Sequence, residues 1–188
     1  MVQWLDEWYK PKYTQRKDNE SKFLIDYFQN NPPKTILDIG CGLAWESRAM
    51  QQTYGSELWL LEGNKTFEQS RGQVGWKGES IKMEFYHSLE QLDAHLKKLG
   101  TKNYHLMDAN NIEIDNDVKF DLVYSAISCG FHYNANTYMD LIKKHSHADT
   151  KIIFDLRTKI KHQHNVEIKQ VLVTGLKHKK CLIEFTDS

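Results

Sequence analysis

The sequence predicts an α/β protein with a Rossmann-like, doubly wound sheet of seven strands that is mostly parallel and has an antiparallel strand at one edge. Short apolar runs alternate with amphipathic helical patterns along most of the chain, which is typical of a parallel sheet with helices on both faces. Only a short connection around Gly175 separates the last two apolar runs, which indicates an antiparallel pair.

The first half of the chain supplies two strands and two helices. Phe23, Leu24, Tyr27 and Phe28 recur on one face of a helical pattern, and the Asn-Asn-Pro-Pro run at 30–33 ends that helix. The expected helices span 18–29 and 44–52, and the expected strands span 35–39 and 58–62.

The second half continues the alternation. Ser88 is a typical N-terminal helix cap, and Gly100 is a typical helix end. We expect segment 128–133 to be a loop at the end of a strand. The expected helices span 88–99 and 136–144, and the expected strands span 104–107, 120–125, 151–155, 166–174 and 180–185.

Length and charge limit the classes of protein to which the chain can belong. The 188 residues fit one domain, with an aromatic and basic N-terminal arm and helix at 1–33, a ligand-binding core at 34–157 and closing strands at 158–188. Lys and Arg together number 25, as do Asp and Glu, so the net charge is zero. This balance argues against a dedicated nucleic-acid-binding protein, although a local basic patch stays possible in principle.

Cysteine usage and hydropathy indicate the compartment. Cys41, Cys129 and Cys181 lack metal-ligand spacing, and an odd count suits a reducing environment. The N-terminus lacks the apolar core of a signal peptide, and we expect no membrane-spanning segment. The prediction is therefore a cytoplasmic protein, whose oligomeric state the sequence leaves open.

Polar residues follow the carboxyl ends of the predicted parallel strands, where sheets of this kind bind their ligands. Asp38, Gly40 and Gly42 follow the first strand, and Glu62 ends the second. A carboxylate about twenty residues past a glycine turn can accept hydrogen bonds from both hydroxyls of a ribose. The pattern predicts a nucleoside-containing ligand.

A nicotinamide dinucleotide fits the pattern less well. The G-x-G-x-x-G fingerprint needs a third glycine where this chain has Trp45. Asp38 lies two residues before the first glycine, and a carboxylate there repels a pyrophosphate but suits a ligand with a cationic end.

Four segments together carry a family resemblance. ILDIGCGLA, LWLLEGN, HLMDANN and KFDLVYSAIS resemble, in this order, the four cofactor motifs of class I S-adenosylmethionine-dependent methyltransferases. Two features depart from the family pattern: Ala44 replaces a frequent third glycine, and segment 158–165 is too short for the long helix usual there. The resemblance implies S-adenosylmethionine as cofactor, with contacts from Asp38, Gly40, Cys41, Gly42, Glu62, Gly63, Asp108, Ala109 and Ser125.

Several acceptor classes lack their signatures here. The turn after the fourth strand reads Ser-Ala-Ile-Ser, without the N/D-P-P-Y run of amino-group methyltransferases, and no proline precedes Cys129 as in cytosine C5 enzymes. The carboxylates that hold Mg²⁺ in catechol-type enzymes are missing before Asp140, so we predict no metal. The histidine pairs 145/147 and 162/164 are interpreted as solvated helix-end and loop residues.

The run SCGFHY at 128–133 is the main clue to the acceptor. His132 is the candidate general base for a hydroxyl, or else a histidine that only hydrogen-bonds within its loop. The other candidate acceptor contacts are Tyr13, Trp45, Tyr133, Asp155 and Arg157.

We therefore predict O-methylation of a small molecule, with sugars as one acceptor class. Two alternatives stay open. SCGFHY also resembles the fourth-motif region of messenger-RNA cap guanine-N7 methyltransferases, and a non-catalytic S-adenosylmethionine-binding module would keep the cofactor motifs without turnover.

Overall fold

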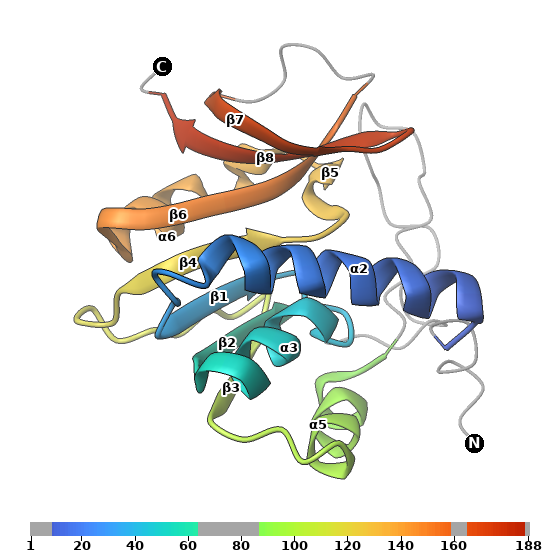
Figure 1. Cartoon of the computed structure of the whole chain (residues 1–188). Coiled ribbons are helices and arrows are strands. Elements are labelled where there is room, and N and C mark those ends of the chain that lie inside the picture. The colour runs from blue at the N-terminus through green and yellow to red at the C-terminus, as the bar shows by residue number, and fades with distance from the viewer. Residues whose placement is uncertain (1–8, 64–86, 159–164, 187–188) are drawn as a thin grey trace.

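The computed structural model describes residues 9–63, 87–158 and 165–186 of the chain. Seven strands form one mixed sheet with the order β3-β2-β1-β4-β6-β8-β7 (Figure 1). In chain order the strands are β1 (Thr35–Ile39), β2 (Glu57–Glu62), β3 (Tyr104–Asp108), β4 (Phe120–Ser125), β5 (Ser128–Tyr133), β6 (Ser146–Arg157), β7 (Val166–Thr174) and β8 (His178–Phe185). Strand β5 is not one of the seven sheet strands.

The helices lie on both faces of this sheet. They are α2 (Pro11–Phe28), α3 (Trp45–Tyr54), α5 (Leu89–Lys98), the 3₁₀ helix η2 (Ala135–Tyr138) and α6 (Met139–Lys144). Helices α2 and α3 lie on the near face in Figure 1, and α6 lies behind the sheet. None of the described helices is both long enough and apolar enough to cross a membrane.

The strand directions confirm the predicted fold class. Strands β3, β2, β1, β4 and β6 pair in parallel, whereas β8 runs antiparallel to both β6 and β7. From β1 the chain moves outward through β2 and β3 and then returns to β4 on the other side of β1. The carboxyl ends of β1 and β4 therefore flank the point where the winding reverses, which is where open α/β sheets bind ligands.

Strand β1 shows how the sheet builds two cores. Ile36 packs into a fully buried cluster with residues of α2, α3 and α5, while Leu37 and Ile39 point to the opposite cluster beside α6. Side chains of a strand alternate between faces, so an apolar run buried on both sides is what a central parallel strand requires.

Two elements differ from the sequence-based expectation. Helix α2 begins at Pro11 rather than at 18, because Pro is well suited to a first helical turn and the polar Lys17 and Ser21 are buried on its inner face. Segment 128–133 is strand β5 rather than a loop. A side chain at Gly130 would contact Leu156 of β6 at 2.8 Å, so glycine is what lets β5 approach β6 closely.

The expected cap of α5 is present. The Ser88 hydroxyl accepts a hydrogen bond from the Gln91 amide at 3.2 Å, and the Gln91 side chain accepts one from the Ser88 amide at 2.9 Å. This reciprocal arrangement is a capping box, and it fixes the start of the helix.

A buried ionic network fastens α2 to the sheet. Lys17 Nζ of α2 lies 2.6 Å from Glu46 Oε1 of α3, and Lys180 Nζ of β8 lies 3.0 Å from Asp155 Oδ1 of β6. The Lys180 ammonium also lies 4.0 Å from Glu20 Oε2 of α2. The network therefore links two helices to two strands through charges that are almost completely removed from water.

Two carboxyls of the network have strongly shifted pKa values. Burial and the hydrogen bond to Glu46 raise the pKa of Glu20 to about 7. Burial alone would raise the pKa of Glu46 as well, but the Lys17 ammonium and the bond with Glu20 outweigh it and lower that pKa to about 2. Of the two carboxyls, Glu20 is thus the one that takes up a proton first as the pH falls, so the site need not hold two negative charges.

We predict that Lys180→Met lowers the free energy of unfolding by about 3 to 5 kcal/mol, because it leaves the Asp155 carboxylate buried without its counter-charge. Equilibrium urea unfolding measures this loss. Lys169→Met on β7 is the control, since Lys169 pairs with Glu167 and Glu184 at the surface and its loss should leave stability almost unchanged. Equal effects of the two substitutions would contradict the importance of the buried pair.

Candidate active site at the carboxyl edge of the sheet

The turn after β1 is held tightly against β2. The backbone amides of Gly40 and Cys41 both donate to the Leu61 carbonyl oxygen, at 2.7 and 3.2 Å. Gly40, Gly42 and Ala44 all have positive φ, at 66°, 54° and 50°. Ala44 thus takes the left-handed conformation at the position where the resemblance expects a third glycine, so the shape of the turn is kept without it.

Gly40 is where another segment comes closest to this turn. A Cβ atom built on Gly40 would lie 1.8 Å from Ser128 Oγ and 3.5 Å from the Tyr133 hydroxyl oxygen. Those two side-chain oxygens lie 3.1 Å apart and share a hydrogen bond. Ser128 and Tyr133, the first and last residues of β5, therefore both lie against the glycine turn. Burial raises the pKa of Tyr133 well above its usual range.

Glu62 joins the glycine turn to the end of β2. Its Oε2 accepts a hydrogen bond from the Gly42 amide at 2.8 Å, and its Oε1 accepts one from the Gly63 amide at 2.9 Å. The thiol of Cys41 lies in the same region, and burial followed by the Glu62 and Asp38 charges raises its pKa well above the usual value. A carboxylate is thus fixed at the mouth of the turn.

His87 is a neighbour of this site that the sequence pattern did not single out. It is buried, and burial lowers its pKa although the Glu62 carboxylate acts in the opposite direction. No local motif marks His87 in the sequence.

Asp38 faces the α3 side of the sheet. It is 3% exposed and accepts a hydrogen bond from the Ser47 hydroxyl. Burial raises the pKa of Asp38 to about 7, and the hydrogen bond from Ser47 offsets this only in part. Its contact with a cationic ligand group stays a prediction.

The remaining expected cofactor contacts are engaged within the fold. Asp108 Oδ1 accepts from the backbone and side-chain amides of Asn110 at 2.8 and 2.9 Å, and the Ala109 amide donates to the Glu62 carbonyl at 2.9 Å. The buried Ser125 hydroxyl donates to the Ile39 carbonyl at 2.7 Å and accepts from the Cys129 amide at 2.9 Å. Ser125 therefore ties β1 to β5.

The turn between β4 and β5 is strained. Ile127 has a φ of 49°, which is unfavourable for a β-branched residue. Its amide donates to Asp155 Oδ2 at 3.1 Å, and Asp155 is fully buried. The structure thus places Asp155 beneath this turn and not on an open rim.

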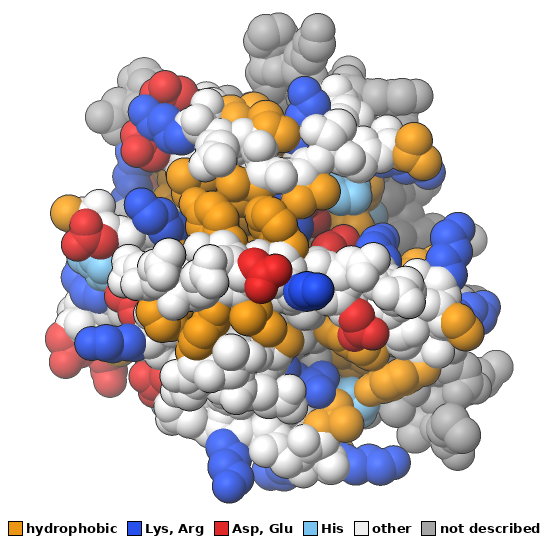
Figure 2. All heavy atoms as spheres, viewed as in Figure 1, with side chains coloured by type: hydrophobic (Ala, Val, Ile, Leu, Met, Phe, Trp, Pro, Cys, Tyr) orange, Lys and Arg blue, Asp and Glu red, His pale blue; other side chains and the backbone are white. Residues whose placement is uncertain are grey.

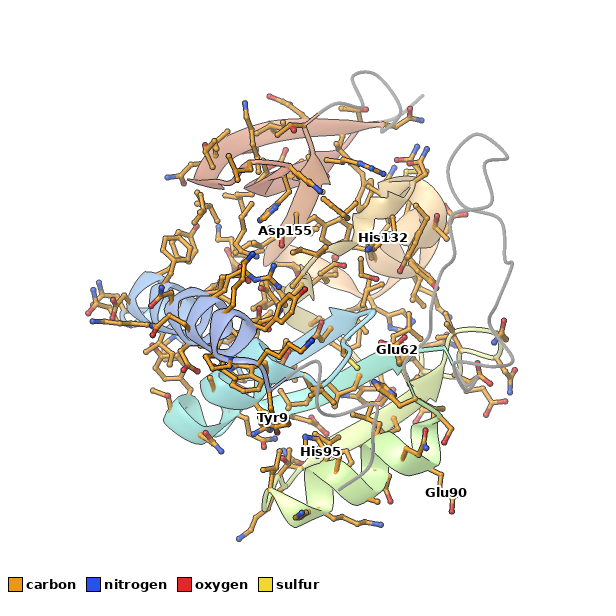
Figure 3. All side chains as sticks on the ribbon, turned by 90° about the vertical axis from the view of Figure 1, so that its right-hand side faces the viewer. Tyr9, Glu62, Glu90, His95, His132 and Asp155 are labelled. Atoms are coloured by element: carbon orange, nitrogen blue, oxygen red, sulfur yellow. The ribbon has the colours of Figure 1, made fainter. Side chains whose placement is uncertain are left out.

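His132 lies in the upper part of the view in Figure 3, and Arg157 is close enough for its charge to act on the imidazole. Arg157 Cζ lies 5.3 Å from the centre of the Phe131 ring, and the Phe131 and His132 rings are 4.9 Å apart in an edge-to-face arrangement. Burial, followed by repulsion from the Arg157 charge, lowers the pKa of His132. The imidazole is therefore neutral at pH 7 and able to accept a proton.

The three expected aromatic contacts of the acceptor do not form one cluster. Tyr133 rests on the glycine turn, whereas the Trp45 indole Nε1 donates to Asp18 Oδ1 of α2 at 3.1 Å. Tyr13 is exposed on the first turns of α2, with Arg16 Cζ 5.7 Å from its ring centre.

Of the paired histidines, His145 differs from the expectation, whereas His147 is exposed as expected. His145 is buried rather than solvated, with Nδ1 2.8 Å from the Val118 carbonyl oxygen, because it closes the end of α6 against the β4 loop. His147 lies 3.0 Å from Asp121 Oδ1, and residues 162 and 164 are outside the described ranges. Within residues 9–63, 87–158 and 165–186, no three His, Cys, Asp or Glu side chains are grouped so as to hold a metal ion.

Comparison with known proteins supports the fold. No protein-family model and no curated protein sequence matches the chain. Among solved structures, it is similar to the ribosomal protein L11 methylase from Lactobacillus delbrueckii subsp. bulgaricus, with 14% identity, a TM-score of 0.58 and coverage of 92% of this chain and 79% of the other.

Two further structures are similar over nearly the whole chain. A variant of MtNAS in complex with S-adenosylmethionine has 12% identity, a TM-score of 0.62 and coverage of 98% of this chain and 66% of the other. The yhhF protein from Escherichia coli has 14% identity, a TM-score of 0.62 and coverage of 91% and 88%. At these identities the similarity shows the fold alone, and that fold is the Rossmann-like fold of class I S-adenosylmethionine-dependent methyltransferases.

We predict that Gly40→Ala destabilises the protein by about 2 kcal/mol or more, because the new methyl collides with Ser128 in addition to straining the backbone. Gly55→Ala is the matched control: φ is 77° there, but a Cβ atom would meet nothing within 4 Å. It should cost only about 1 kcal/mol for the backbone conformation. Equal losses in urea unfolding would show that β5 does not press on the glycine turn.

Proposed function

We propose that this chain is an S-adenosylmethionine-dependent methyltransferase that binds its cofactor across the carboxyl ends of β1 and β2. The observation that carries the proposal is the hydrogen bond of 2.8 Å from the Gly42 amide to the Glu62 carboxylate, at the carboxyl end of β1 and next to the point between β1 and β4 where the strand order reverses. A glycine turn with a fixed carboxylate beside it offers backbone approach on one side and an acceptor for ribose hydroxyls on the other. The residues present therefore fit the cofactor.

The roles of the residues follow from their places. Gly40 and Gly42 add no side chains of their own to the turn, and Glu62 accepts the ribose hydroxyls. Asp38, whose pKa is raised to about 7, becomes fully ionised only beside a cationic group of the ligand. Bound S-adenosylmethionine supplies a methyl group that is already activated by a sulfonium. The protein then has to orient an acceptor and, for a hydroxyl, remove its proton.

We assign the proton-accepting role to His132 and propose a hydroxyl acceptor on a small molecule, with sugars among the classes to screen. The lowered pKa of His132 supports the assignment, because a neutral imidazole is present over the whole physiological range. Arg157, whose charge contributes to that shift, is available beside it to contact a polar or anionic acceptor.

We predict that S-adenosylhomocysteine binds the wild-type protein and raises its melting temperature, since a ligand of the native state adds RT ln(1 + [L]/Kd) to stability. Glu62→Gln should weaken binding about tenfold or more, because an amide cannot accept two hydroxyl hydrogen bonds with the strength of a carboxylate. Titration calorimetry measures both affinities.

The control for this experiment is Glu90→Gln, which changes an exposed glutamate on the first turn of α5 (Figure 3). It should leave the affinity unchanged. The cofactor proposal fails if the folded wild type binds neither S-adenosylmethionine nor S-adenosylhomocysteine.

We predict that His132→Gln lowers the rate of methyl transfer to a hydroxyl about a hundredfold, the usual scale of general base catalysis, without changing cofactor affinity. The wild-type rate should rise with pH and level off below the ordinary histidine pKa of about 6.5, since the pKa of His132 is lowered. Release of S-adenosylhomocysteine with sugars, phenols and capped RNA as acceptors provides the assay.

His147→Gln is the control, because His147 pairs with Asp121 away from β5. Undiminished hydroxyl methylation in His132→Gln would remove the base assignment. Turnover of capped RNA alone, insensitive to His132, would favour the guanine-N7 alternative, and turnover of no acceptor would favour the binding module.

A further inference from the structure

A groove of about 350 Å³ runs between α2 and α3, on the face shown in Figure 2. We propose that this groove is a second ligand site, separate from the candidate active site, that binds an organic anion: a phosphate or carboxylate group attached to a flat ring. Neither the glycine turn nor β5 lines the groove. The inference is therefore independent of the proposed function.

Arg48 is the first reason for an anion. Its Nε atom is shielded from water and has no hydrogen-bond partner in the part of the chain that the structure describes. Within that part, the Arg48 side chain makes one long hydrogen bond, 3.5 Å from Nη1 to the Leu43 carbonyl oxygen, and no described carboxylate pairs with it. A shielded guanidinium nitrogen without an acceptor costs stability, so a rotation of the Arg48 side chain toward an oxyanion in the groove would satisfy a group that the fold leaves unpaired.

The groove carries more positive than negative charge, since Arg48 and Lys22 line it together with the single carboxylate of Asp18. Arg48 is close enough to His95 of α5 to lower the pKa of that imidazole, although burial is the larger cause. Lys22 of α2 and Gln52 of α3 also line the groove, and neither has a hydrogen-bond or ion-pair partner among the described residues. Three side chains with free donors thus converge on one groove.

The apolar part of the groove indicates what carries the anion. Trp45, Ile25 and Ala49 line it beside these donors. The Trp45 indole is held by its bond to Asp18, and its ring centre lies 5.5 Å from that of Tyr9. The one carboxylate of the groove, Asp18, is therefore engaged in orienting the indole. A fixed indole face next to a guanidinium suits a flat ring that bears an oxyanion.

Phenyl phosphate is a suitable probe because it joins a ring and an oxyanion in one molecule. We expect it to bind the wild-type protein about tenfold or more tightly than inorganic phosphate or benzyl alcohol, each of which offers only half of the recognition. Benzoate in place of phenyl phosphate distinguishes a carboxylate from a phosphate ligand. Binding is followed in ¹H–¹⁵N spectra through the indole Nε1–H of Trp45, assigned with Trp45→Phe.

Arg48→Met is the decisive variant, because it removes the charge and keeps a straight apolar stem. It should weaken phenyl phosphate binding about tenfold or more while leaving the melting temperature equal to or above that of the wild type, since the unpaired nitrogen is gone. A purely structural arginine would instead lower the melting temperature and leave probe binding unchanged.

Arg157→Met distinguishes the groove from the candidate active site, since it removes the arginine that we place beside the acceptor. It should leave the effect of phenyl phosphate on the Trp45 signal unchanged, as should saturating S-adenosylhomocysteine. Loss of binding in Arg157→Met but not in Arg48→Met, competition by S-adenosylhomocysteine, or absence of any shift at Trp45 would each overturn the proposal.

Discussion

The ion pair between Lys180 and Asp155 is the contact on which the closing strands and the candidate site both depend. Lys180 is 1% exposed, so its ammonium needs compensation inside the protein. It finds Asp155 of β6 at 3.0 Å and the Tyr124 hydroxyl of β4 at 3.0 Å, with Glu20 of α2 further away. One cation therefore joins the antiparallel strand β8 to the centre of the sheet and to the helix that covers it.

The same pair reaches the candidate active site through the strained turn between β4 and β5. A positive φ at Ile127 costs about 1 to 3 kcal/mol and persists only where the surroundings impose it. Asp155 imposes it by accepting the Ile127 amide hydrogen, and Ser125 holds the other side of the turn. Because His132 follows in β5, this clamp sets the place of the proposed base. The interior position of Asp155 favours such an orienting role over direct contact with an acceptor.

Much of the fold was predictable from the sequence because it depends on local patterns. The buried ionic network could not be predicted, since it depends on partners that are distant in the sequence. The run of residues 35–42 predicts a buried strand and a glycine turn through composition alone, and the structure has both. Lys17, Glu46 and Lys180 are residue types that are almost always exposed, and only tertiary contacts bury them. Strand β5 was not predicted for a similar reason, since no sequence signature shows that Gly130 allows it to approach β6.

Helix α3 connects the two ligand sites that we propose. Ala44, in its left-handed conformation, redirects the chain from the glycine turn into this helix and so fixes which residues face inward. Glu46 and Ser47 then point to the buried network and to Asp38, whereas Trp45 and Arg48, one turn apart, face the groove beside α2. A change in the glycine turn would rotate both sets together, because a helix moves as a rigid body. The geometry that shapes the candidate cofactor site therefore also shapes the groove, even though the two sites share no lining residue.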